Sequence, residues 1–286
     1  MKMTKKSYLF ILPAFTILLT SCGGGDKDKP VGTDSTSNTV DTMIVEEEEE
    51  VSAVLPSPVA VAEIFANAGI DYKPTLPNSL DNVSKYSTSS KKALNFGVYT
   101  SDLAFCIVSD KNKEASEYLK AIRTLGNEIG LNQVFDNESL LSRFDKNLNS
   151  QDSLTDLMIE IKSRIDDYHE SNGESEKNFI YFSGAWLEGM YLGAVSSDKN
   201  EKAGKAMSAQ FYMLDDILKG LNKVKEGSSD YNDLIKSFED IKTAYMGLAT
   251  VAAAEADAIY DVALTAPEVK VLADKIIALR NEVTKF

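Results

Sequence analysis

The sequence predicts an all-α protein, and three observations support this class. None of its seven prolines lies between residues 78 and 266, whereas β-rich folds need frequent turns, which proline often marks. Apolar side chains recur at helical spacing in several long segments. Two segments also resemble each other at an offset of 88 residues, which indicates a duplicated helical hairpin. We therefore predict a compact bundle of about eight helices.

Residues 1–21 are predicted to be a membrane-targeting signal. Three lysines precede an apolar stretch, Tyr8 to Leu19, which is shorter than the roughly 20 residues that a membrane span needs. The residues Leu19-Thr20-Ser21-Cys22 resemble the lipobox of bacterial lipoproteins. This resemblance implies cleavage before Cys22 and its acylation with fatty acids such as palmitate, where two or more chains anchor a protein stably. An uncleaved anchor, or a chance cysteine after a signal, is the alternative.

Residues 22–57 are predicted to be a disordered acidic tether. They contain the run Gly23-Gly24-Gly25, polar Ser/Thr-rich sequence and the run Glu46 to Glu50, so they offer little apolar surface for a core. A calcium or cationic-partner site in the glutamate run is the alternative, although contiguous glutamates lack the spacing of a calcium loop. Gly23 after the cysteine resembles lipoproteins of the outer membrane, on either its periplasmic or its surface side.

Residues 58–286 are predicted to form the helical domain, with hairpin units at 90–178 and 179–266 and a closing helix at 267–286. Four segments have a continuous apolar face at helical spacing. These faces lie within residues 115–129, 154–168, 231–248 and 269–283. Pro267 fits the first turn of the closing helix.

The duplication is suggested by a repeated tetrapeptide. Ser109-Asp110-Lys111-Asn112 recurs as Ser197-Asp198-Lys199-Asn200, and the same offset places Gly97 on Ala185. We expect each tetrapeptide to cap the second helix of its hairpin. Chance similarity between two helical hairpins is the alternative.

Charge and cysteine content exclude several classes of function. The formal net charge is −14, which is a poor match for nucleic acid or for direct docking on anionic lipid. Acylated Cys22 would thus provide the contact with the bilayer. Only one other cysteine is present, so Cys106 is predicted to be a buried, unpaired thiol.

Acidic residues inside apolar helices are the candidate site. A buried carboxylate is costly unless it is paired, so such acids either face water or meet something positive. The candidates are Asp102, Glu188, Glu255, Asp257 and Asp261. Three interpretations stay open: solvent-facing or salt-bridged acids, a cavity for a cationic or sugar-like ligand, and a carboxylate-bound metal.

Aromatic side chains would wall the ligand cavity in the second interpretation. They are Tyr99, Tyr181, Trp186, Tyr191 and Tyr260. Aromatic residues at helical spacing are more often part of a core. His169 is the only histidine and precedes Asn172-Gly173, a typical helix end, so we predict that it lies at the surface.

Two function classes follow from the sequence. The first is a non-enzymatic binding or scaffolding lipoprotein that holds an envelope protein, a glycan or a small ligand. The second is a carboxylate-based enzyme, which needs two acids about 5 to 10 Å apart in a cleft. No phosphate loop, dinucleotide fingerprint, zinc-ligand spacing or nucleophile elbow is present, so we expect no cofactor and favour the first class.

Overall fold

The computed structural model describes residues 55–135, 138–197, 201–225 and 228–286. These residues form α-helices and two short 3-10 helices, with no strand among them. The all-α class is therefore confirmed. The predicted signal, Cys22 and nearly all of the predicted tether lie outside the described residues.

In chain order, the elements are α1 (Pro58–Asn67), η1 (Leu80–Lys85), α2 (Ser89–Val108), α3 (Asn112–Glu128), α4 (Asn132–Phe135), α5 (Glu138–Lys146), α6 (Gln151–Asn172), α7 (Lys177–Ser196), α8 (Glu201–Ser208), α9 (Met213–Lys225), η3 (Ser229–Tyr231), α10 (Asn232–Met246), α11 (Ala249–Ala252) and α12 (Ala266–Val283). Eight of the described α-helices have ten or more residues. The predicted helical faces at 115–129, 154–168, 231–248 and 269–283 fall mainly on α3, α6, α10 and α12.

Local sequence explains where the helices begin and end. The side chain of Ser57 caps α1, and Pro58 follows in its first turn, where a missing N–H costs nothing. Thr265 and Glu268 form a capping box at the start of α12, and Pro267 lies in its first turn as predicted. Gly173 ends α6 with a φ of 66°, a left-handed conformation that glycine adopts easily.

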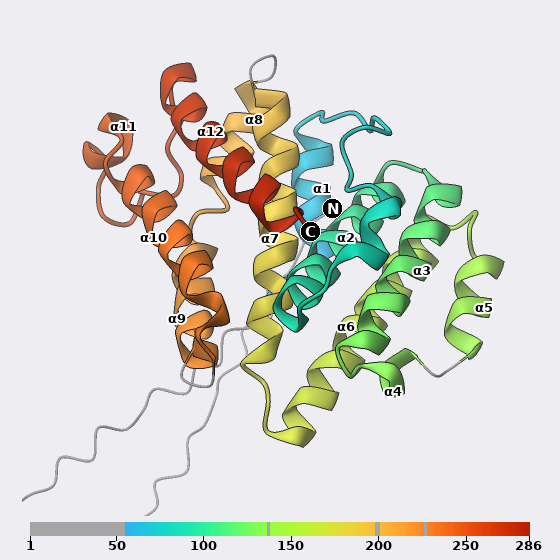
Figure 1. Ribbon diagram of the computed structural model, residues 1–286. Helices are drawn as coiled ribbons and strands as arrows, with labels where there is room; N and C mark the ends of the chain where they lie inside the picture. Colours follow the sequence, from blue (N-terminus) through green and yellow to red (C-terminus); the bar gives the residue numbers. More distant parts are fainter. Residues whose placement is uncertain (1–54, 136–137, 198–200, 226–227) are drawn as a thin grey trace, which may run out of the picture. The chain divides into compact units, whose positions relative to one another are not determined.

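The helices α2 and α7 form the centre of the packing and make the most extensive contact of any helix pair in the described chain. Figure 1 shows α7 in the middle of the helical unit, with α12 lying across it. Gly97 of α2 allows this contact, because a Cβ there would lie 2.0 Å from the carbonyl oxygen of Tyr181. Gly184 does the same from α7, where a Cβ would lie 2.1 Å from the carbonyl oxygen of Leu94.

These two helices begin the two predicted hairpin units. Gly97 contacts Ala185 across the helix pair, and these two positions correspond at the offset of 88. The helices that follow differ, because α3 is one continuous helix, whereas α8 and α9 are separated by a turn at residues 209–212. The duplication therefore stays a prediction. The contact between α2 and α7 is compatible with it.

The predicted capping role of the first tetrapeptide is wrong. Lys111 is the N-cap residue of α3 and makes no side-chain capping bond. The turn instead ends α2: Asp110 has a φ of 55°, and the N–H of Lys111 donates to the carbonyl oxygen of Cys106 at 2.8 Å. This bond pattern satisfies the last carbonyls of a helix. The second tetrapeptide lies mostly outside the described residues.

The helix α12 closes the bundle by packing against α7, α10, α2 and α8. Its buried face includes Val269, Leu272, Ile276 and Val283, together with one charged residue, Arg280. In the described part of the chain, no helix combines the length and apolar character needed to cross a bilayer.

Candidate functional site

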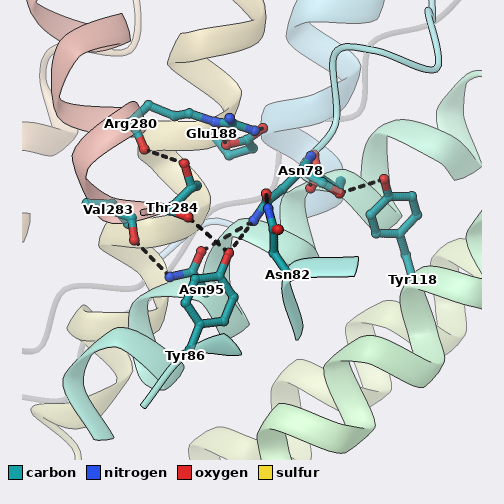
Figure 2. Close-up of polar contacts among 10 residues, drawn as sticks. Asn78, Asn82, Tyr86, Asn95, Tyr118, Glu188, Arg280, Val283 and Thr284 are labelled. Carbon is teal, nitrogen blue, oxygen red and sulfur yellow. Dashed lines mark hydrogen bonds and ion pairs between the residues drawn. The ribbon is translucent and has the colours of Figure 1, made fainter. Parts of the chain in front are cut away.

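A buried ion pair joins α7 to α12. The guanidinium of Arg280 donates two hydrogen bonds of 2.8 Å to the carboxylate of Glu188, which is 0 % exposed. The ring of Tyr191 lies 4.3 Å from the guanidinium carbon, a distance that favours a cation–π interaction. Both oxygens of Glu188 are thus engaged within the fold, and Figure 2 shows the pair beside the C-terminal end of α12.

Asp102 of α2 lies next to this pair and is also 0 % exposed. The backbone N–H of Asn78 donates to its Oδ2 at 2.9 Å, while Oδ1 has no partner among the described residues. Burial raises the pKa of Asp102 well above its ordinary value of 3.8, and the neighbouring Glu188 carboxylate raises it further. One arginine serves two buried acids, so the arrangement favours the protonated form of Asp102.

Asn78 links this cluster to a wider polar layer (Figure 2). Its side-chain amide donates to the hydroxyl of Tyr86 at 2.9 Å, and its carbonyl oxygen accepts from the hydroxyl of Tyr118 at 2.9 Å. Asn95 of α2 donates to the carbonyl oxygen of Val283 at 3.0 Å. These bonds tie the segment between α1 and α2 to α2, α3 and the end of α12. The buried polar groups are therefore mostly paired, which is what a structural layer requires.

The structure brings together two of the five predicted acids. Asp102 and Glu188 lie together in this buried cluster beside Arg280, in agreement with the interpretation that these acids are salt-bridged. Glu255, Asp257 and Asp261 are exposed on the irregular segment that follows α11. No group of three or more histidine, cysteine or acidic side chains in the described residues is arranged to hold a metal ion. The five acids therefore do not form one site, and the apolar stretch that carries the last three is not one continuous helix.

The predicted aromatic walls lie in different places. Tyr99 donates to the carbonyl oxygen of Ser79, and the indole of Trp186 donates to that of Gln210. Tyr191 covers Arg280, as described above. Tyr260 stacks on Tyr245 with ring centroids 5.9 Å apart. Of the five, Tyr181 lines one of the pockets described below.

The prediction for His169 is wrong, since its side chain is 2 % exposed. The last turn of α6 packs on α7, which places the imidazole ring 5.6 Å from the Tyr181 ring. Neither ring nitrogen has a hydrogen-bond partner in the described chain, and Nδ1 lies 3.7 Å from Glu174. Burial lowers the pKa of His169 below its ordinary 6.5, and Lys177 lowers it further. The ring therefore favours its neutral form.

Cys106 is buried and free, as the sequence predicted. Burial raises the pKa of its thiol, and Asp102 raises it further. A thiol of this kind is a poor nucleophile, because the reactive species is the thiolate.

An open groove of about 960 Å³ lies between the segment before η1 and the first half of α3. Tyr72, Pro74 and Pro77 form part of its wall. Charged residues also line it: Asp81, Glu114, Glu117 and Lys113. Three carboxylates against one ammonium give these side chains a formal charge of −2. Glu117 is paired with Lys120 at 2.7 Å, so Asp81 and Glu114 supply the negative charge that a partner would meet. Tyr118 connects the groove to the polar layer through its bond to Asn78.

A second hollow, of about 60 Å³, lies between α2, α6 and α7. Its walls are almost wholly apolar and include Phe96, Met158 and Ile161. It shares no lining residue with the groove. The two hollows would therefore accept different chemistries.

No protein-family model matches this chain, and neither a curated protein nor a solved structure matches it.

Sequence reasoning missed Arg280 and Asn78, the residues that organise the buried cluster. A signal for Arg280 was present, because it lies four residues after Ile276 and eleven after Val269 on the apolar face of α12. A single basic residue on an otherwise apolar helix face predicts a buried acidic partner. Asn78 lies in a segment without helical periodicity, so its pattern gives no comparable signal.

Proposed function

We propose that this chain is a lipid-anchored binding protein of the bacterial cell envelope, without enzymatic activity, and that the groove between residues 72–81 and α3 holds its partner. The groove carries the proposal, because it is open to solvent and because Tyr72, Pro74 and its three carboxylates are at least partly exposed. Specific binding sites combine apolar and aromatic surface with a few polar groups in this way.

Support for the anchor comes from the sequence. The lipobox-like residues Leu19 to Cys22 follow a short basic and apolar stretch, and Gly23 favours the outer membrane. Acyl chains on Cys22 would hold the protein on an envelope membrane, on its periplasmic or surface side. The acidic domain would not bind an anionic membrane by its own charge.

Support for binding over catalysis comes from the placement of the acids. Glycoside cleavage by two carboxylates requires both of them to flank a cleft that holds the substrate. Asp102 and Glu188 are fully buried, and Arg280 occupies both oxygens of Glu188. Their surroundings suit a structural ion pair better than a reacting site.

The groove favours a cationic, extended protein segment. Its net negative side chains would attract lysine or arginine, and Tyr72 and Pro74 offer flat surfaces to an extended backbone. A glycan, which is uncharged or acidic in most envelopes, would gain less from the carboxylates.

The anchor is tested by labelling growing bacteria that express the full chain with radioactive palmitate. We expect label in the protein and recovery of the protein with membranes. Cys22→Ala should abolish both the label and the membrane association. Equal labelling of the Cys22→Ala protein would refute the assignment of the lipidated residue.

The groove is tested with an octalysine peptide and an octaglutamate peptide, measured by fluorescence anisotropy on the full chain. Octalysine should bind in a salt-dependent way, and octaglutamate should not. The double variant Asp81→Asn/Glu114→Gln should weaken octalysine binding about tenfold, because two charges leave the groove. The matched control Asp257→Asn/Asp261→Asn removes the same charge from an exposed segment elsewhere and should bind as the parent does. An equal loss of octalysine binding in both variants would mean that the net charge of the protein, and not the groove, attracts the peptide.

A further inference from the structure

The hollow between α2, α6 and α7 has the features of a small-molecule pocket. Phe96 and Thr100 of α2, Met158 and Ile161 of α6, and Ala185 of α7 line it. Its volume of about 60 Å³ exceeds the roughly 10 to 15 Å³ that one water needs. Because the walls offer water almost no polar partner, replacing water there by an apolar molecule would be favourable in free energy.

One polar group in this pocket lacks a partner. Asn178, in the first turn of α7, lines the pocket, and its Oδ1 is buried with no hydrogen-bond donor among the described residues. An acceptor that is buried without a donor destabilises the fold, by the loss of its bond to water. A ligand that brings a donor to this oxygen would remove that cost.

A charged pair lies at the same pocket. Lys162 and Asp166 line it and bind each other at 2.5 Å along one face of α6. Their side chains are 28 % and 38 % exposed, so they mark the side that water reaches. Because each charge already has its opposite partner, the pocket gives no preference to a charged ligand.

We infer that this pocket binds a small, uncharged, apolar molecule with one hydrogen-bond donor, such as a short-chain alcohol. The alkyl part would pack on Phe96, Met158 and Ile161, and the hydroxyl would donate to Oδ1 of Asn178. This inference is independent of the proposed function, since the groove lies on other residues and favours charge.

The first experiment follows the methyl group of Met158 by NMR while butan-1-ol is added, a smaller alcohol that suits a pocket of about 60 Å³. All samples are the full chain with Cys22→Ala, which removes the acylated cysteine. We expect a saturable shift of the Met158 signal at millimolar butan-1-ol. Thr100→Leu should fill the pocket and weaken binding at least tenfold. The matched control is Thr124→Leu at an exposed position of α3, which loses the same kind of bond to the carbonyl four residues earlier. It should bind as the parent does.

The second experiment tests the donor. Diethyl ether has the same number of non-hydrogen atoms as butan-1-ol but no donor, so it should bind about 2- to 10-fold more weakly, the range of one net hydrogen bond. Asn178→Leu should abolish this preference while both molecules still bind. A shift that never saturates, equal binding by Thr100→Leu and the parent, or an alcohol preference that survives in Asn178→Leu would each overturn the inference.

Discussion

The guanidinium of Arg280 donates two hydrogen bonds of 2.8 Å to the carboxylate of Glu188, although 92 positions separate the residues in the chain. The parallel geometry of the two bonds fixes α12 in both position and rotation against α7. Asp102 lies beside the pair, so three ionisable groups lie together in the interior of the fold.

We predict that Arg280→Met destabilises the protein by about 3 to 5 kcal/mol, because two buried acids lose their cation. The double variant Glu188→Leu/Arg280→Met should be more stable than Arg280→Met alone. Urea unfolding followed by circular dichroism measures both. Arg164→Met is the control, since Arg164 pairs with Glu160 at the surface, and it should cost less than about 1 kcal/mol. Equal costs at the two arginines would contradict a buried pair.

Asp102→Asn should change the pH dependence of stability. The pKa of Asp102 is raised in the folded state, so its stabilising contribution is fully present below the ordinary value and is lost as pH rises through the folded value. Asparagine holds no proton to lose. The difference in unfolding free energy between Asp102→Asn and the parent should therefore move in favour of the variant as pH rises from 5 to 9. The exposed Asp274→Asn should show no such trend, and a flat difference for Asp102→Asn would disprove the raised pKa.

His169 should make the protein sensitive to mild acid. Its pKa is lowered by burial and by Lys177, against the opposite effects of Glu174, Glu176 and Asp166. The unfolded chain therefore binds the proton more tightly, so stability is fully present above pH 6.5 and falls as pH drops below it. Unfolding free energies at pH 8 and pH 5.5 measure this loss. His169→Leu should reduce it, and an unchanged loss in this variant would assign the sensitivity to other groups.

Gly97→Ala should destabilise the protein by about 1 to 3 kcal/mol, because the new methyl group would overlap the backbone of α7. Thermal unfolding measures the effect. Gly247→Ala is the matched control, since a Cβ at Gly247 would come no closer than 3.3 Å to any atom. A Gly97→Ala protein as stable as the control would mean that α2 and α7 are further apart.

The fold class and most of the long helices followed from the sequence because their signals are local. The apolar face of α6, for example, is visible in residues 154–168, and its end is marked by Gly173. The same reasoning failed at Asp110, where an aspartate takes the left-handed conformation expected of glycine. This left-handed turn is set by how α2 and α3 pack in three dimensions, which no local sequence pattern shows.

The candidate site was less predictable, because it depends on contacts between distant residues. Asp102 and Glu188 were identifiable as acids inside apolar helices, but nothing local shows that they meet. Glu255 and Asp257 have the same kind of neighbours in sequence, yet they are exposed. His169 carries a helix-end signal that holds for the backbone, whereas its side chain is covered by a ring of the next helix.

The buried pair also bears on the order in which the chain can fold. A ribosome, or any channel that the chain enters N-terminus first, delivers Asp102 and Glu188 well before Arg280. Until α12 arrives, closing α2 onto α7 would enclose two acids without their cation, which is unfavourable. The cost of burying Asp102 and Glu188 without Arg280 would thus keep an incomplete chain unfolded in this region, and it would favour a state in which the polypeptide can still pass through a channel.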